Sequence, residues 1–185
     1  MTLETTIARL DRHIATARPT YYAQLGAPLD DAAITALEAH FGVVVPEDLK
    51  ALYRWKNGQQ HDCHASFVNN AEFLPLADAL ESAKELTSMI GSDFESPDWW
   101  RAGWFPIFHN GGGDHICYDA EGAFTGEPGQ LLEFWHADSD RNVIAPDLAS
   151  FLQSLAAYYE ATPVAAFNNY FEVKPPAGFP KSFEA

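Results

Sequence analysis

A run of three glycines between two apolar segments constrains the fold of this chain more than any other feature. The run Asn110-Gly111-Gly112-Gly113 lies between residues 104–109 (WFPIFH) and 115–119 (HICYD). Because glycine adopts positive φ at no steric cost, this pattern predicts a β-hairpin whose turn is slightly longer than the tightest type. A glycine-rich loop can also bind phosphate, but that use normally requires a helix N-terminus directly after the loop. A strand-like run follows instead, so the sequence favours a hairpin over a phosphate site.

The composition is typical of one folded domain. The chain has 185 residues, of which 47% are hydrophobic, so it can bury a core and is too apolar for extended disorder. Cys63 and Cys117 lie far apart, which argues against a disulfide scaffold and favours a reducing compartment. No segment approaches the ~18 apolar residues of a membrane span. Glu4 and Asp11 interrupt the apolar pattern of the N-terminus, so no signal peptide is expected and we predict a cytoplasmic protein.

The charge of the chain is strongly negative. It has 26 acidic and 11 basic residues, with a formal net charge of −15. Residues 92–140 contain ten acidic residues against Arg101 alone, and so carry −9 of that total. Such a surface repels nucleic acids and anionic membranes and attracts basic partners. Two interpretations stay open: acidic residues in turns that keep the surface hydrated, or a face that binds a basic protein.

Apolar residues at helical spacing predict five helices, in residues 3–14, 34–41, 49–55, 77–90 and 148–159. Pro19 closes the first helix, and residues 21–28 are predicted to form a loop. Asp30 is a suitable N-cap for the second helix. Pro46 suits the start of the third, so the second and third helices would form a helical hairpin. Pro146 and Asp147 open the last helix.

Short apolar runs at 72–76 and 131–135 predict further strands, and Pro75 favours an edge position for the first. The tail from Thr162 has four prolines and is expected to pack as an extended arm. We therefore predict one α+β domain with a mostly antiparallel sheet of about four to six strands, several helices, an N-terminal helical hairpin and a long C-terminal helix. The aromatic residues interpreted as sheet core are Trp104, Phe105, Phe108, Phe134 and Trp135.

Three segments, in this order and spacing, resemble the SUKH superfamily. The first contains Glu38, Phe41-Gly42, Val45-Pro46 and Asn57-Gly58. The second contains Trp104-Phe-Pro-Ile107, Gly111-Gly-Gly-Asp114 and Cys117-Tyr-Asp119. The third contains Leu132 to His136, then Ile144 and Phe151-Leu152. The resemblance implies an N-terminal helix and loop (1–28), a SUKH-like (SMI/KNR-like) domain (29–160) and a Pro/aromatic C-terminal arm (161–185).

This superfamily includes a fungal cell-wall synthesis regulator and many bacterial immunity proteins. The resemblance therefore implies a non-enzymatic domain that binds other proteins, with no cofactor. Because almost the whole chain is domain, we expect an immunity protein that neutralises a basic toxin domain, such as a nuclease, through its acidic surface. The alternative is a regulatory scaffold of the cell-wall-regulator type. The residues expected to contact the partner are Asp93, Glu95, Asp98, Trp99, Trp100, Asp114, Asp119 and Asp138.

Catalytic and metal-binding alternatives have weaker support. The sequence contains none of the common catalytic motifs, GxSxG, HExxH, Walker A or GxGxxG. His109, Asp114 and His115 could form the acid–base set of a small hydrolase, or they could simply fix the hairpin turn. The run His61-Asp62-Cys63-His64 could supply metal ligands, but close neighbours do not easily reach one ion, and a polar loop is the simpler interpretation.

Overall fold

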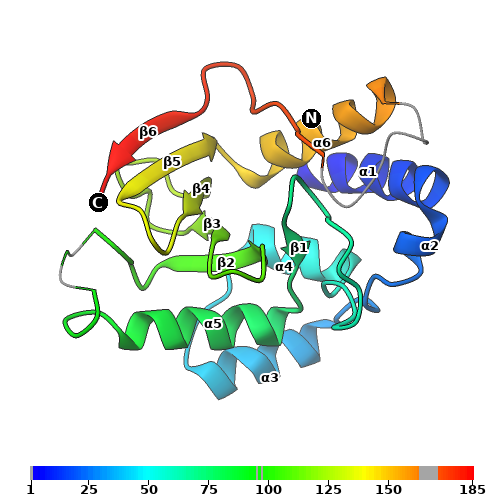
Figure 1. The fold of residues 1–185 in the computed structure, drawn as a ribbon. Coiled ribbons are helices and arrows are strands. Elements are labelled where there is room, and N and C mark those ends of the chain that lie inside the picture. The colour runs from blue at the N-terminus through cyan, green and yellow to red at the C-terminus, as the bar shows by residue number, and fades with distance from the viewer. Residues whose placement is uncertain (1, 95, 97, 163–170) are drawn as a thin grey trace.

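The glycine-rich hairpin forms two adjacent strands of a six-stranded antiparallel sheet. The computed structural model describes residues 2–94, 96, 98–162 and 171–185. Within them the helices are α1 (Leu3–Ala17), α2 (Pro19–Tyr22), α3 (Asp31–Phe41), α4 (Glu47–Trp55), α5 (Leu76–Ser88) and α6 (Leu148–Ala161). The strands are β1 (Glu72–Phe73), β2 (Trp104–His109), β3 (His115–Asp119), β4 (Gln130–Phe134), β5 (Asp140–Ala145) and β6 (Lys181–Glu184). The strands lie in chain order across the sheet (Figure 1), which confirms the predicted α+β domain.

Polar groups of the chain itself fix the turn between β2 and β3. The backbone N–H of Asn110 donates to the carbonyl of Asp114 at 3.2 Å. The N–H of Gly112 donates to Asn110 Oδ1 at 2.8 Å. Gly113 has a φ of +100°, and a Cβ atom there would lie 3.1 Å from the ring of His136. A larger residue at this position would therefore strain the backbone and crowd the neighbouring connection.

Both faces of the sheet are buried, which explains why β2 is continuously apolar instead of alternating. One face contributes Phe105, Tyr118 and Leu131 to the main core, which also contains side chains of α1, α4 and α6. The opposite face forms a smaller core that includes Trp100, Trp104, Cys117, Leu132, Phe134 and Val143. In Figure 1, α1 and α6 lie side by side at one end of the molecule, and β6 lies at the other end.

Helix ends follow the predicted capping signals. The side chains of Asp30 and Asp147 each accept a backbone N–H three residues further on, at the starts of α3 and α6. Gly42, in the left-handed conformation, ends α3. The first helix ends before Pro19, as predicted, but Pro19 also opens the short helix α2, so the loop predicted over 21–28 begins only after Tyr22. The fixed φ of proline suits the first position of a helix, which explains this start.

The C-terminal arm completes the sheet. Strand β6 pairs with β5 and forms the second edge, opposite β1. Further back, the N–H groups of Phe171 and Val173 donate to the backbone and side-chain oxygens of Asn69 at 3.2 and 2.9 Å. Both side chains are buried in the main core. Residues 163–170 of the predicted arm lie outside the described residues. None of the helices in the described part of the chain has the length and apolarity needed to cross a bilayer.

Candidate partner-binding surface

The connection between β4 and β5, residues 135–139, is where several of the predicted site residues meet. Asp114 reaches it from the hairpin turn: its Oδ1 accepts the backbone N–H of His136 at 3.0 Å and lies 2.8 Å from the ring Nδ1. Its Oδ2 accepts a hydrogen bond from the side-chain amide of Asn110 at 2.8 Å. Partial burial raises the pKa of the Asp114 carboxyl, but the bonds from His136 and Asn110 outweigh burial and leave it below its ordinary value.

Arg141 ties the segment 98–101 to the same connection. Its side chain is fully buried, and its Nη1 donates to the carbonyls of Asp138 and Asp140 at 2.6 and 2.8 Å. Its Nη2 donates to the carbonyl of Trp99 at 3.0 Å, and its guanidinium lies 5.0 Å from the centre of the Trp99 ring. The cation is thus held by backbone oxygens and aromatic rings. Among the described residues, no side-chain cation forms an ion pair with Asp138 or Asp140.

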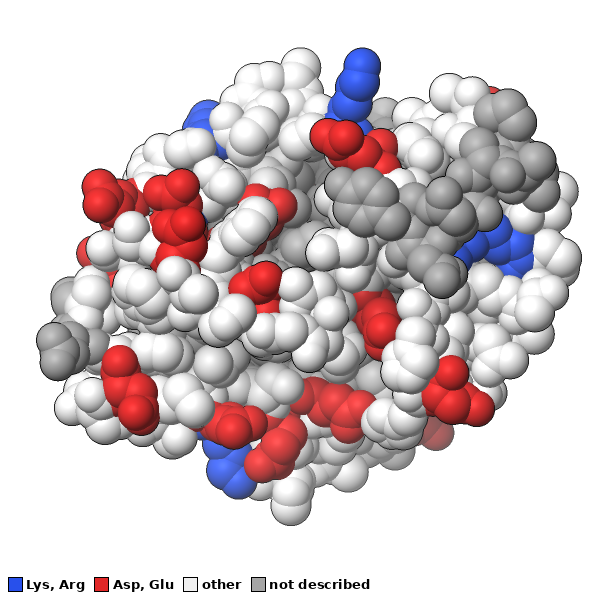
Figure 2. Space-filling model, in the orientation of Figure 1, with Lys and Arg blue, Asp and Glu red and all other residues white. Residues whose placement is uncertain are grey.

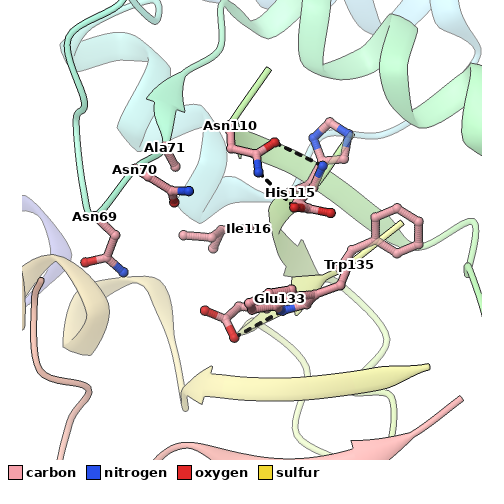
Figure 3. A pocket seen from close by; sticks show the side chains of 10 residues that line it. Asn69, Asn70, Ala71, Asn110, His115, Ile116, Glu133 and Trp135 are labelled. Carbon is pink, nitrogen blue, oxygen red and sulfur yellow. Dashed lines mark hydrogen bonds between the residues drawn. The ribbon is translucent and has the colours of Figure 1, made fainter. Parts of the chain in front are cut away.

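A small pocket of about 80 Å³ opens beside this connection. Figure 3 shows Asn69 and Asn70 on one side of it, Asn110 on a second side, and Glu133 with Trp135 on a third. Trp135 is 44% exposed, and its Nε1 lies 3.4 Å from Glu133 Oε2. We define the "acidic end surface" as the exposed part of the molecule formed by Asp98, Trp99, Asp114, Glu133, Trp135, His136, Asp138 and Asp140.

Acidic side chains extend well beyond this surface. In Figure 2, Asp and Glu side chains are spread over the part of the face near β5 and β6 and over the part near α5, whereas Lys and Arg are sparse. Asp93 is exposed in the turn after α5, while Asp98 is partly buried and forms an ion pair with Arg101. Glu95, also predicted to bind the partner, lies outside the described residues.

Two of the predicted contact residues are buried and require correction. Trp100 is 1% exposed, packs in the smaller core and donates its Nε1–H to Thr87 Oγ1 at 3.1 Å. Asp119 is 0% exposed, and its carboxylate accepts the backbone N–H groups of residues 121–123 and a side-chain N–H of Gln130. Both residues therefore stabilise the fold and offer no surface to a partner. Trp99, next to Trp100, is half-buried and keeps part of its ring accessible.

Trp135 was predicted to lie in the sheet core, and this prediction was wrong because its side chain is exposed. It follows the last residue of β4 and points out of the sheet into the pocket rim (Figure 3). The other four aromatic residues of that prediction are buried. Glu133, His136 and Arg141 were not predicted as site residues. The one available signal for Arg141 was its position directly after the acidic segment 92–140.

The hydrolase alternative depends on His109, Asp114 and His115. Asp114 directs both of its oxygens to His136 and Asn110, as described above. His109 Nε2 lies 3.5 Å from a carboxylate oxygen of Glu72. Burial lowers the pKa of His115 from 6.5 to about 4, so this ring is neutral at physiological pH. Asp114 and His109 thus bond to different groups, whereas the rings of His109 and His115 stack across the hairpin with centroids 6.4 Å apart. This arrangement matches the interpretation that the three residues fix the hairpin.

The two histidine side chains of residues 61–64 also lie near different carboxylates. His61 Nδ1 lies 3.6 Å from Asp78 Oδ2, whereas His64 Nδ1 lies 3.2 Å from Glu72 Oε1. Cys63 is buried between them in the main core. Within the part of the chain that the structure describes, no three His, Cys, Asp or Glu side chains are grouped to hold a metal ion.

Fold and surface together define an α+β domain with an acidic, tryptophan-bearing edge. The sequence model of the SMI1 / KNR4 family (SUKH-1) matches residues 28–154. The chain belongs to this family, whose members fit immunity or regulatory roles. None of the curated proteins matches the chain significantly.

Proposed function

We propose that this protein is an immunity protein that binds a basic toxin domain, such as a nuclease, through the acidic end surface. The observation that carries the proposal is the position of Trp135 on one surface with Glu133, Asp138 and Asp140, none of which forms an ion pair among the described residues. The single arginine at the centre, Arg141, is buried under the surface and bound to carbonyl oxygens. A basic partner would therefore meet uncompensated negative charge.

The two kinds of residue on this surface would have different roles in binding. Exposed carboxylates such as Asp138 and Asp140 steer a basic domain toward the surface and raise the association rate. Trp135 offers a large amphipathic side chain next to a pocket, which is the usual composition of an energetic hot spot. Because a stable interface buries roughly 800 Å² on each partner, contacts would extend toward Trp99 and Asp93.

Charge reversal tests the proposal. The probe is a basic toxin domain taken from the genes that neighbour the gene for this chain, and the readouts are protection on co-expression and the association rate of the purified proteins. We expect Asp138→Lys with Asp140→Lys to slow association by about tenfold and to weaken protection. The control is Glu81→Lys with Glu85→Lys on α5, which makes the same charge change at exposed sites outside the surface. Equal effects of the two double variants would contradict the proposal.

A regulatory scaffold is the alternative that family membership also fits. In that case the same acidic end surface would retain signalling or cell-envelope proteins in a pull-down, and no neighbouring toxin domain would be neutralised. Loss of retention in the Asp138→Lys, Asp140→Lys variant would then assign the surface to that partner.

A further inference from the structure

A second groove lies between α1, α4 and the segment after α2. It has a volume of about 640 Å³, and its lining includes Ile7, Ala8, Ala51 and Trp55. In Figure 1, α1 lies at the end of the molecule opposite β6, so this groove is remote from the edge formed by β5 and β6. It belongs to neither the hairpin nor the acidic end surface.

The groove has a floor of small side chains and a wall of two aromatic rings that are held by hydrogen bonds. Ala8 is exposed on α1, and Ala51 is partly buried on α4, so the backbone of a partner could approach both helices closely. On the wall, Tyr22 Oη and Trp55 Nε1 both donate to Asp11 Oδ1 at 2.7 Å. These two bonds hold the aromatic rings in place before any partner arrives, which lowers the entropic cost of binding.

One end of the groove carries uncompensated negative charge. Glu47 is paired with Arg54 at 2.6 Å, but among the described residues neither Glu4 nor Asp48 forms an ion pair with a basic side chain. Burial raises the pKa of the Asp48 carboxyl, and the nearby charges of Asp147 and Glu4 raise it further. A cation placed between Glu4 and Asp48 would relieve this repulsion.

We propose that this groove binds an amphipathic helix of a protein partner. The apolar side of that helix packs over Ala8 and Ala51, and a lysine or arginine reaches Glu4 and Asp48. A helix fits because α4 itself has nine residues, about 14 Å, and the small side chains of Ala8 and Ala51 line the groove from α1 and α4. The carboxylates select a basic helix and disfavour a nucleic acid or an acidic segment.

A titration with synthetic peptides tests this inference. The probe is a helical peptide of about 14 residues with leucine at i, i+3, i+4 and i+7 and lysine on its flanks. A matched peptide carries glutamate in place of each lysine. Binding to isotope-labelled protein is followed by NMR. We expect saturable shifts confined to the amides of residues 4–11 and 47–56 with the lysine peptide, and none with the glutamate peptide.

Substitutions in the protein locate the binding. Ala8→Arg fills the floor of the groove and adds positive charge, and we expect it to lower the affinity for the lysine peptide by at least about tenfold. Ala36→Arg, at an exposed position on α3, is the matched control and should leave the affinity unchanged. Circular dichroism checks that both variants are folded. Absence of saturable shifts, shifts outside the groove, or equal binding by wild type and Ala8→Arg would each overturn the inference.

Discussion

Asp114 joins the glycine-rich turn to the β4–β5 connection through hydrogen bonds with His136. Its Oδ1 accepts the backbone N–H of His136 at 3.0 Å and lies 2.8 Å from the ring Nδ1. Strands β3 and β4 separate the turn from the connection in sequence, but the two loops lie next to each other at one end of the strands. Through this carboxylate, the hairpin positions the residue next to Trp135, so the scaffold and the proposed binding surface are one structure.

Replacing Asp114 tests this link. Asp114→Ala removes the acceptor for the His136 N–H and for the Asn110 amide, and we expect the free energy of unfolding to fall by about 1–2 kcal/mol. Because the folded pKa of Asp114 is lowered, its contribution is present above the ordinary carboxyl pKa and is lost as pH falls through the folded value. Urea titrations of both proteins from pH 7 to about 3 should therefore converge at the acid end. A constant difference at every pH would contradict this role.

His115 should make stability depend on pH in a higher range. Its pKa is about 4 in the folded state against an ordinary 6.5, so the unfolded chain binds a proton first. Stability from the neutral ring is complete above about pH 6.5 and is lost as pH falls toward about 4. In the variant His115→Phe, which keeps an aromatic ring but cannot be protonated, thermal melts should depend less on pH between these values. An unchanged slope would show that His115 is not buried in neutral form.

Alanine substitutions of Asp119 and Asp138 should have very different effects on stability, although both residues belong to the same acidic segment. Asp119→Ala leaves three backbone N–H groups, two of them buried, without their acceptor, and we expect a loss of about 2–4 kcal/mol in unfolding free energy. Asp138→Ala, at an exposed position, should stay within about 0.5 kcal/mol of wild type. Chemical denaturation measures both. Similar losses in the two variants would mean that Asp119 is not the structural residue inferred from its contacts.

Arg141 is expected to hold the segment 98–101 on the sheet. Arg141→Ala removes the donors to the carbonyls of Trp99 and Asp138, and hydrogen exchange at the amides of 98–101 and 136–140 should accelerate together. Arg141→Lys keeps the positive charge, but an ammonium group lacks the two fixed N–H directions of the planar guanidinium. It should therefore restore only part of the protection of these amides from exchange. Full rescue by lysine would indicate that charge alone, and not the fork geometry, is what matters.

Local signals made much of the fold predictable from the sequence. Gly111 and Gly113 of the hairpin adopt positive φ, and Asp30 and Asp147 are effective caps, so these features depend on neighbouring residues only. Strand β6 was missed because it exists only by pairing with β5, about 40 residues earlier, and such pairing leaves no local pattern.

The proposed site was less predictable for the same reason. Adjacent tryptophans at 99 and 100 do not by themselves indicate which ring is buried, and it is packing in the smaller core that buries Trp100. The sequence Asp119-Ala-Glu-Gly122 is a common turn pattern in which the aspartate bonds to the following amides, and it could have identified Asp119 as structural. Trp135 looked like a strand residue because β4 ends one position earlier, and strand ends are the least certain feature of a sequence-based prediction.

The affinity of Trp135→Ala for the basic toxin domain encoded beside its gene tests the central claim most directly. Because Trp135 is 44% exposed, the substitution should leave the melting temperature nearly unchanged. Calorimetry should nevertheless show binding weakened by about a hundredfold, as for a hot-spot residue, and protection on co-expression should be reduced. Wild-type affinity in a folded Trp135→Ala variant would contradict the assignment of the acidic end surface as the binding site.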